Sequence, residues 1–327
     1  MLAAIYEKTG AAREVLRVVE LPDPQPAAGE VRVKLATSGV NPSDVKTRAG
    51  RRTTVLPYPR IVPHSDGAGV IDAVGPGVPE SRLGERVWVW NACWGRADGT
   101  AANYVALPSA QAVPLPASVS FAAGACLGIP ALTAWHAVHM DGGVAGKAVL
   151  VTGGAGAVGH YAVQFAQAAG ARCVIATTSG PEKAALARAD GADEVINYRE
   201  EDVAARVLEA TAGAGVERVV EVDIAANLRT VLDALRAEGD IVAYGSGAPE
   251  IAVPFLPSVL KNIRYRFFIV YHLSATDRAR ALADLTRQLE QGDLGHHLGP
   301  SFPLREIAAA HEAVERGAFG NVVVTLD

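Results

Sequence analysis

The stretch from Lys147 to Gly170, KAVLVTGGAGAVGHYAVQFAQAAG, constrains the fold of this chain more than any other. Its apolar start, Val149 to Val151, has the β-branched character of a strand buried on both faces of a parallel sheet. Three glycines follow at the GxGxxG spacing, and then a helical pattern that ends at Gly170. A strand, a tight turn and a helix in this order predict a dinucleotide-binding unit, in which backbone amides and the helix N-terminus face a pyrophosphate.

The context of the three glycines strengthens this prediction. Glycine-rich turns also occur where a strand simply meets a helix, so the GxGxxG spacing alone is weak evidence. Here a second apolar strand, Cys173 to Ala176, follows at the distance expected for a βαβ unit. We therefore expect dinucleotide binding at Gly154, Gly156 and Gly159, with Gly154 permitting the turn, Gly156 admitting the pyrophosphate and Gly159 packing the helix against the strand.

Composition excludes several other classes of protein. The chain has 327 residues and half of them are apolar, which predicts two domains with substantial cores. No apolar run reaches the roughly 18 to 20 residues of a membrane-spanning helix, and the first ten residues do not resemble a signal peptide. The net charge of -5 forms no basic stripe for nucleic acid. Three dispersed cysteines fit a reducing cytoplasm.

Two patterns divide the chain. Up to about Pro116, short β-branched runs separated by glycine and proline predict a barrel-like β unit. From there to about Val270, strands alternate with helices, which predicts an α/β doubly wound parallel sheet. The six expected strands are Val149 to Thr152, Cys173 to Ala176, Glu194 to Ile196, Val219 to Val222, Ile241 to Tyr244 and Tyr265 to Val270. The tail adds helices at Thr276 to Gln291 and Leu304 to Arg316, and a last strand at Val322 to Leu326.

The end of the second strand bears on the choice of cofactor. Folds that bind NAD carry an acidic residue about 20 residues after the glycines, and this chain has none there. Glu182 fits as the partner of Ser179 in a capping box, although Ser179 is also a candidate ligand. Lys183 is positioned to meet a 2′-phosphate, or is a solvated helix lysine, and Tyr198 is expected against the same end of the sheet.

A series of motifs across nearly the whole chain gives a resemblance to a known family. It includes GVNPSDVKTRAG, HSDGAGVIDAVG, GTAANYVALP, LGIPALTAWHAV, VLVTGGAGAVGHYAVQFA and GADEVINYREED. In this order they resemble the zeta-crystallin-type quinone oxidoreductases of the medium-chain dehydrogenase/reductase superfamily. The resemblance implies a GroES-like catalytic β-barrel domain at residues 1–124, a Rossmann NADPH-binding domain at 125–272, and a tail, 273–327, that completes the catalytic domain. It also implies NADPH in the cleft between the domains.

Zinc-dependent relatives share this fold, so the metal question depends on particular residues. Their catalytic zinc needs cysteine, histidine or similar ligands around an open position. The matching positions are Asn41, Ser65 and Ile129. Asn41 and Ser65 are weak ligands and Ile129 cannot ligate, so the resemblance implies an enzyme without a metal. His64 lies beside Ser65, but a lone histidine in a turn is more often a surface or capped residue than a ligand.

The resemblance also assigns catalytic candidates in the loop that starts at Asn41. Asn41 would lie beside the nicotinamide and hydrogen-bond a substrate oxygen, or it forms an Asx turn before Pro42. Lys46 stands where many relatives have tyrosine, and is either a cation for a developing oxyanion or an exposed helix lysine. Ser43 holds the position that relays a proton in the zinc relatives.

Further cofactor contacts follow from the motifs. The resemblance implies contacts at Ala155, Gly156, Ala157, Val158, Thr178, Asn227, Tyr244, Gly245, Ser246, Phe268, Ile269 and Val270. Trp94, in the distinctive segment NACWGRAD, is either a stacking platform for a flat substrate or a packed loop residue.

Three functions therefore stay open. The first is zinc-independent, NADPH-dependent reduction of a quinone. The second is NADPH-dependent reduction of α,β-unsaturated carbonyls or enoyl thioesters, and the third is noncatalytic NADPH binding. We also expect a homodimer through Tyr265 to Tyr271, because FFIVY is too apolar for an open sheet edge and relatives pair their sheets there.

Overall fold

The computed structural model describes residues 1–326, which form two compact units. One unit contains the chain up to Pro130 and the residues from Leu282 onward, and the other is Ala131–Ala281. Within the first unit, the backbone N–H of Ile129 donates to the Asp66 carboxylate. The second boundary lies within helix α10 (Ala275–Gln291).

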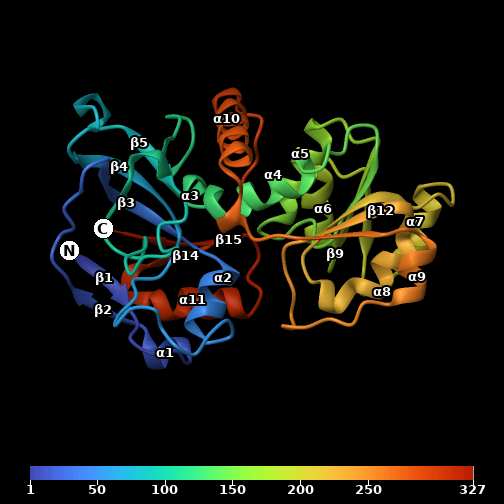
Figure 1. Ribbon diagram of the computed structural model, residues 1–327, viewed down its shortest axis with the longest axis horizontal. Helices are drawn as coiled ribbons and strands as arrows, with labels where there is room; N and C mark the ends of the chain where they lie inside the picture. The colour runs from blue at the N-terminus through green and yellow to red at the C-terminus, as the bar shows by residue number, and fades with distance from the viewer. Residues whose placement is uncertain (327) are drawn as a thin grey trace. The chain divides into compact units, whose positions relative to one another are not determined.

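The unit formed by Ala131–Ala281 contains one six-stranded parallel sheet (Figure 1). The strands lie in the order β10-β9-β8-β11-β12-β13, so the chain starts in the middle of the sheet and winds outward first to one side and then to the other. This arrangement confirms the prediction of a doubly wound sheet. The strands are β8 (Ala148–Val151), β9 (Cys173–Thr178), β10 (Glu194–Asn197), β11 (Val216–Glu221), β12 (Leu235–Ala243) and β13 (Arg264–Phe267).

Helices cover both faces of this sheet. Helix α5 packs against both α4 and α6, and α7 packs with α8 (Figure 1). Every residue of β8 is buried, as expected for a central strand between two helical layers. The helices are α4 (Leu132–His139), α5 (Gly159–Ala168), α6 (Pro181–Ala189), α7 (Val203–Ala210), α8 (Ile224–Ala234) and α9 (Phe255–Leu260).

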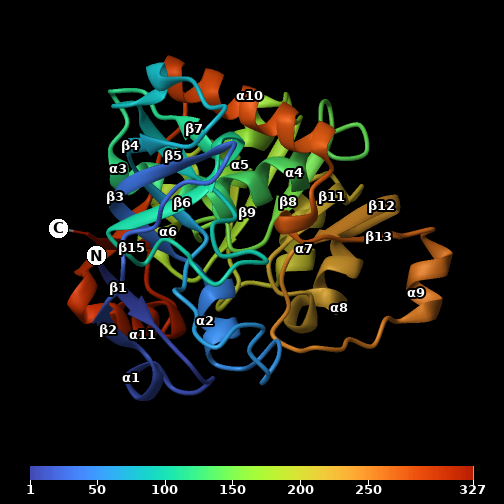
Figure 2. The ribbon, with the colours of Figure 1, turned by 60° about the vertical axis from the view of Figure 1, so that its left-hand side comes forward.

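The edge strand β13 is shorter than the sequence predicts. The run Tyr265 to Val270 was expected to be one strand, but β13 ends at Phe267 and a 3-10 turn follows at Val270–His272. Only β12 pairs with β13 among the described strands, and the side chain of Phe267 is 60% exposed. Figure 2 shows β13 and α9 at the outer side of this unit.

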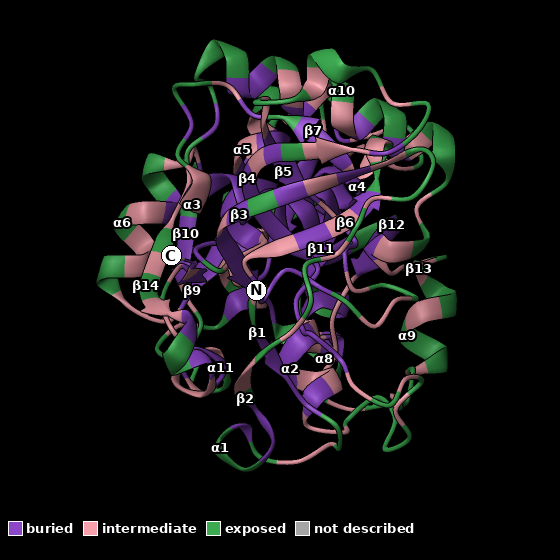
Figure 3. Ribbon diagram, turned by 90° about the vertical axis from the view of Figure 1, so that its left-hand side faces the viewer, coloured by how far each residue is buried: buried purple, intermediate pink, exposed green. Residues whose placement is uncertain are grey.

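The other unit is built on a seven-stranded sheet and a separate two-stranded sheet. The long strand β3 (Glu30–Val40) pairs with β4 (Asp66–Val74), β6 (Tyr104–Pro108) and the C-terminal strand β15 (Asn321–Thr325). The tail therefore pairs directly with the N-terminal part of the chain. Figure 3 shows buried residues alternating with intermediate and exposed ones along β3. The remaining strands are β1 (Leu2–Ile5), β2 (Arg17–Glu20), β5 (Arg86–Val89), β7 (Ala112–Pro114) and β14 (Leu298–Pro303).

Short helices close this unit. Alternation along β3 directs Val31, Val33 and Leu35 into its core, which also includes residues of α11. The helices are α1 (Ala12–Val15), α2 (Pro42–Arg48), α3 (Phe121–Gly124) and α11 (Ile307–Glu315), with 3-10 turns at Glu80–Arg82, Ser109–Gln111 and Leu304–Glu306 and a π-helical turn at Leu127–Ala131. No helix in the described part of the chain is both long and apolar enough to span a membrane.

Candidate cofactor and active site

The glycine turn lies between β8 and α5, as the sequence predicts. The turn uses a different glycine for its left-handed backbone, however, because Gly153 has a φ of 65° and Gly154 does not have a positive φ. Gly154 is needed for packing, since a Cβ there would lie 2.6 Å from the Cβ of Ala176. A Cβ on Gly159 would lie 2.1 Å from the carbonyl oxygen of Gly153, which confirms that close packing requires glycine at the start of the helix.

Hydrogen bonds attach the turn to the next strand. The N–H of Gly153 donates to Thr177 Oγ1 at 3.0 Å, and the N–H of Gly154 donates to the Thr177 carbonyl at 2.9 Å. At the helix start, the buried His160 lies with its Nδ1 2.9 Å from the Gly156 carbonyl oxygen, so that Nδ1–H is the donor. The conformation of the turn is therefore fixed by the protein itself.

A cavity of about 270 Å³ lies beside this turn, at the carboxyl ends of β8, β9 and β11. It brings together two predicted cofactor residues, Tyr198 and Asn227. It also includes Thr152, Thr177 and Asp223, which the sequence analysis missed. These three residues could have been recognised in the sequence, because they are polar and lie at or just after the ends of predicted parallel strands, where doubly wound sheets bind ligands.

Glu221, at the end of β11, orients Asn227. Glu221 is fully buried, and its Oε1 accepts hydrogen bonds from Asn227 Nδ2 at 2.8 Å and from the N–H of Asp223 at 2.6 Å. Burial raises the pKa of Glu221. Because the amide nitrogen of Asn227 is held by Glu221, its carbonyl oxygen is left as an acceptor for a ligand hydroxyl or amine.

A second cavity, of about 260 Å³, lies at the end of β12. Its lining includes four predicted cofactor residues, Tyr244, Gly245, Ser246 and Phe268. A Cβ on Gly245 would lie 2.0 Å from the Val222 carbonyl oxygen, so glycine is required there. Burial raises the pKa of Tyr244 far above its ordinary value. Ile269 and Val270 are not among the residues that line this cavity.

The segment after β9 corrects one prediction. Helix α6 starts at Pro181 with Gly180 at its N-cap, and no side chain caps it, so the capping box of Ser179 and Glu182 is wrong. Proline favours the first helical position, which moves the cap to the residue directly before it. Thr178 is buried, and its Oγ1 has no hydrogen-bond partner within residues 1–326. Lys183 is half-buried in the first turn of α6.

The predicted catalytic residues lie at α2, in the other unit. Asn41 precedes this helix and is 3% exposed, while Ser43 and Lys46 are half-buried. Asp44 Oδ2 accepts the N–H of Asn41 at 2.8 Å. The side-chain Nδ2 of Asn41 donates to Asp66 Oδ2 at 2.8 Å.

Asp66 is a further residue that the sequence analysis missed. It is fully buried, and the same Oδ2 that accepts from Asn41 also accepts from the N–H of Ile129 at 2.8 Å. Two of the three positions compared with zinc ligands are thus bonded to one carboxylate oxygen. Asp66 lies in the HSDGAGVIDAVG motif, but this motif did not indicate its partners, which lie 25 and 63 residues away.

Trp94, the predicted substrate contact, lines neither of these two cavities. Trp94 is 40% exposed in the loop after β5. Within residues 1–326, no group of three or more histidine, cysteine, aspartate or glutamate side chains is arranged to hold a metal ion.

Comparison with known proteins agrees with this geometry. Residues 27–117 match the alcohol dehydrogenase GroES-like domain, and residues 157–287 match the family described as zinc-binding dehydrogenase. The chain is 30% identical to the quinone oxidoreductase of Sus scrofa, over 93% of this chain and 91% of that protein. It is 32% identical to a 2-haloacrylate reductase of Burkholderia sp, over 99% of this chain and 98% of that protein.

Solved structures show the same relationship. An NAD-dependent alcohol dehydrogenase superposes with a TM-score of 0.90 at 33% identity, and covers the whole of both chains. The quinone oxidoreductase of Thermus thermophilus, whose complex with NADPH is also known, superposes with a TM-score of 0.84 at 30% identity and also covers both chains fully.

The fold and the glycine turn define a nicotinamide-dependent oxidoreductase with a GroES-like and a Rossmann domain. Within that class, this chain belongs to the quinone oxidoreductase family of the medium-chain dehydrogenase/reductase superfamily.

Proposed function

We propose that this protein is an NADPH-dependent, zinc-independent quinone reductase. The observation that carries the proposal is the hydrogen bonding of Asp66 Oδ2 to both Asn41 and the backbone of Ile129. At two of the three positions that match zinc ligands, the Asn41 side chain and the Ile129 backbone are bonded to a carboxylate that is not itself one of these positions. An enzyme without a Lewis acid is suited to an acceptor that is already electrophilic, and a quinone is such an acceptor.

The residues at the glycine turn fit a dinucleotide. The turn has close backbone packing that a Cβ would block, and the nearby buried Thr178 Oγ1 has no partner in the described chain. We propose that the turn residues Ala155 to Gly159 hold the pyrophosphate, while Asn227 and Tyr198 contact the adenosine half. Tyr244, Gly245, Ser246 and Phe268 to Val270 would contact the nicotinamide half. When bound, NADPH supplies a hydride from C4 of its nicotinamide.

The choice of NADPH over NADH rests on the end of β9. No acidic residue follows this strand before Glu182, so no carboxylate there binds the ribose hydroxyls or repels a phosphate. Lys183 lies in the first turn of the next helix, and Ser179 lies just before it. We propose that these two side chains bind the 2′-phosphate.

On the other unit, the α2 residues supply the polar groups for the acceptor. Reduction of a quinone puts negative charge on its oxygen, and donors that are already in place lower the cost of that charge. Asn41 is held rigidly by Asp66, and its amide has a second N–H besides the one bonded to that carboxylate. We propose that Asn41 and Lys46 stabilise the oxygen, that Ser43 relays a proton, and that Trp94 stacks on the flat ring.

The test is a substrate panel under steady-state conditions. We expect NADPH oxidation with simple ortho- and para-quinones, and no oxidation of saturated alcohols with NADP. Turnover of saturated alcohols without quinone turnover would contradict the proposal. Tight NADPH binding without turnover of any acceptor would favour the noncatalytic function instead.

Reduction of activated alkenes is the second candidate. The specific observation in its favour is the 32% identity to a 2-haloacrylate reductase, whose name describes such an acceptor. This reaction needs a proton at carbon as well as the hydride, so it depends more strongly on a relay such as Ser43. Rapid reduction of enones, enoyl thioesters or haloacrylates without quinone turnover would establish this alternative.

We also propose that the protein is a homodimer in the cytoplasm. The edge strand β13 carries the exposed Phe267, and α9 exposes four apolar side chains, Phe255, Leu256, Val259 and Leu260. Apolar groups beside an unpaired strand edge are a typical association surface. The three cysteines form no disulfide in the structure, which agrees with a reducing compartment.

A further inference from the structure

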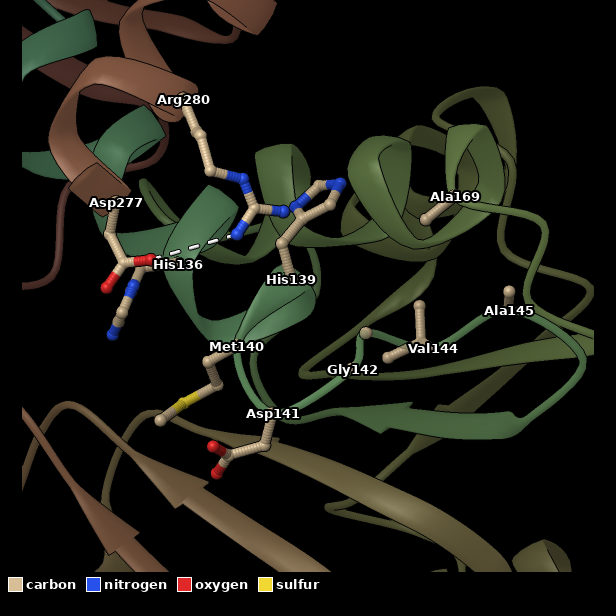
Figure 4. A pocket seen from close by; sticks show the side chains of 11 residues that line it. His136, His139, Met140, Asp141, Gly142, Val144, Ala145, Ala169, Asp277 and Arg280 are labelled. Carbon is tan, nitrogen blue, oxygen red and sulfur yellow. Dashed lines mark ion pairs between the residues drawn. The ribbon is translucent and has the colours of Figure 1, made fainter.

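The Ala131–Ala281 unit contains a larger cavity of about 680 Å³, away from the glycine turn (Figure 4). It is lined by the loop from Met140 to Ala145, which leads into the amino end of β8. Ala169, which follows the last residue of α5, also lines it. The glycine turn follows the carboxyl end of β8, so the Met140 to Ala145 loop and the glycine turn lie at opposite ends of this strand. A cavity of this size is within the usual range for small-molecule sites.

The polar groups of this cavity come from three elements. Helix α4 contributes the imidazoles of His136 and His139, the loop contributes Asp141, and α10 contributes Asp277 and Arg280 (Figure 4). Burial lowers the pKa of His136, which makes this ring a neutral hydrogen-bonding group at pH 7. Besides the two histidines, the cavity is lined by one guanidinium and two carboxylates.

Both carboxylates have other partners. Asp141 Oδ2 lies 2.6 Å from Arg266 Nε, and Asp277 Oδ2 accepts the hydroxyl of Ser274 at 2.8 Å. The ion pair between Arg280 and Asp277 is long, at 3.9 Å, and is too long for a direct hydrogen bond. Arg280 is consequently less tightly bound to a carboxylate than Arg266 is.

One aromatic ring lies beside the Arg280 side chain, which is 61% exposed. Its guanidinium carbon lies 5.7 Å from the centre of the Trp135 ring, and Trp135 stacks on His139 with centroids 4.5 Å apart and planes 16° from parallel. His139 Nδ1 donates to the Trp135 carbonyl at 2.8 Å, which fixes the imidazole. The cation–π contact orients the guanidinium over the Trp135 ring and leaves it accessible to an anion.

The rest of the lining is apolar or lacks side chains. Met140, Ala145 and Ala169 provide methyl and thioether surface, and Gly142 and Gly143, which have left-handed backbones, add no side chain to this wall. The cavity therefore combines one accessible guanidinium, the neutral imidazole of His136, two carboxylates that have other partners, and apolar surface. It matches an amphipathic anion better than an inorganic ion.

We propose that this cavity binds a small organic monocarboxylate with an apolar body, whose carboxylate pairs with Arg280. A phosphate dianion fits less well, because Asp141 and Asp277 line the same cavity and would repel a second negative charge. The apolar body lies against Met140, Ala145 and Ala169. This cavity shares no lining residue with the two cavities proposed for NADPH, although its His136 ring contacts Phe268, with ring centroids 4.8 Å apart.

The test uses the full chain and 3-phenylpropanoate, a saturated carboxylate that cannot serve as a hydride acceptor. We expect isothermal titration calorimetry to give a Kd below about 1 mM, with and without saturating NADPH. Arg280→Gln should weaken binding roughly tenfold to a hundredfold, as expected for loss of a charge-assisted bond. Arg287→Gln, the same change two turns further along α10, should not alter it. The neutral analogue 3-phenylpropanamide should bind at least about tenfold more weakly.

Three results would overturn the proposal. One is no binding up to about 10 mM, since such an affinity is below that of a built site. The second is binding that Arg280→Gln or the amide analogue leaves unchanged, and the third is competition with NADPH. If Arg280→Gln unfolds, Ala169→Leu serves instead, because its larger side chain fills part of the cavity and should abolish binding while NADPH affinity is retained.

Discussion

Asn41 and Ile129, 88 positions apart in the sequence, donate to the same oxygen of Asp66, each at 2.8 Å. These bonds connect the start of α2, the start of β4 and the segment before α4. All three groups are buried, so their partners cannot be replaced by bulk water. The position of the Asn41 amide, at the start of α2, therefore depends on this carboxylate.

We predict that Asn41→Ala and Lys46→Ala each slow quinone reduction. Losing one well-placed donor to a developing oxyanion costs about 3 to 4 kcal/mol of transition-state stabilisation, or roughly two to three decades in rate. The measurement is kcat and kcat/KM for a para-quinone, together with the Kd for NADPH. Because Asn41 is also hydrogen-bonded to Asp66, loss of the Asn41 side chain could disturb the local structure. Asp66→Asn, which changes the partner of Asn41 but keeps the Asn41 amide, is the control for this structural effect. Equal losses of NADPH affinity and turnover in all three variants would assign a structural role to Asn41 and Lys46.

We predict that activity does not need a metal ion. Asn41 and Ile129 are both bonded to Asp66, and neither Ile129 nor Ser65 is a strong zinc ligand. Exhaustive chelation followed by desalting should leave quinone turnover unchanged, and elemental analysis should show less than stoichiometric zinc. Activity that falls on chelation and returns with added zinc would contradict this prediction.

We predict that Lys183→Ala weakens NADPH binding but not NADH binding. A charge-assisted contact to a 2′-phosphate contributes about 1.5 to 3 kcal/mol, which is about one to two decades in Kd. Fluorescence titration with both cofactors measures the difference. Arg188→Ala, on the same helix but exposed in its last turn, is the control. If both cofactors weaken equally, Lys183 has only a structural role.

We predict a dimer that depends on α9 and β13. The exposed residues Phe255, Leu256, Val259 and Leu260 lie at spacings that form one helical face. Light scattering at micromolar concentration should give twice the 34.0 kDa mass of the chain. The double variant Phe255→Ser with Leu260→Ser should give a monomer with an unchanged circular dichroism spectrum. A monomeric parent protein would contradict the prediction.

We predict that His64 makes stability fall as the pH is lowered. His64 Nε2 lies 2.9 Å from His311 Nε2, and its Nδ1 lies 2.8 Å from Ser38 Oγ, in a fully buried cluster. Burial lowers the pKa of His64 to about 3 and holds that of His311 well below its ordinary value. The unfolded chain therefore binds more protons than the folded chain between about pH 3 and 6.5, so the free energy of unfolding decreases as pH falls through 6.5.

Urea unfolding at pH 7.5 and pH 5 tests this effect. His64 alone should lower the free energy of unfolding by about 2 kcal/mol between these values. Asp44 acts in the opposite sense, because burial raises its pKa to about 7 and favours its protonated folded form. The comparison is therefore with His64→Asn, since asparagine tolerates the φ of 77° found here, and with the exposed His272→Asn as control. A pH dependence that His64→Asn leaves unchanged would rule out this role.

The sequence by itself determined the parts of the molecule that depend on local periodicity. Short apolar runs separated by helical segments located all six strands of the parallel sheet, and the GxGxxG spacing located the turn before α5. The absence of an acidic residue directly after β9 could be recognised from the sequence, because the end of a strand is a local feature. The predicted helices of the tail also formed, since an amphipathic face of 3.6-residue period is sufficient to specify them.

Tertiary structure decided what depends on groups that are distant along the chain. Gly153 rather than Gly154 took the left-handed backbone because Gly154 had to pack against Ala176. Strand β13 ended at Phe267, where the chain turns away from β12 and pairing stops. Asp66 became the partner of Asn41 and Ile129, and Arg280 came to lie over Trp135, through packing between segments that no sequence spacing relates. A buried carboxylate or a fixed guanidinium derives its role from these neighbours, and only the folded chain brings them within hydrogen-bond or ring-contact distance.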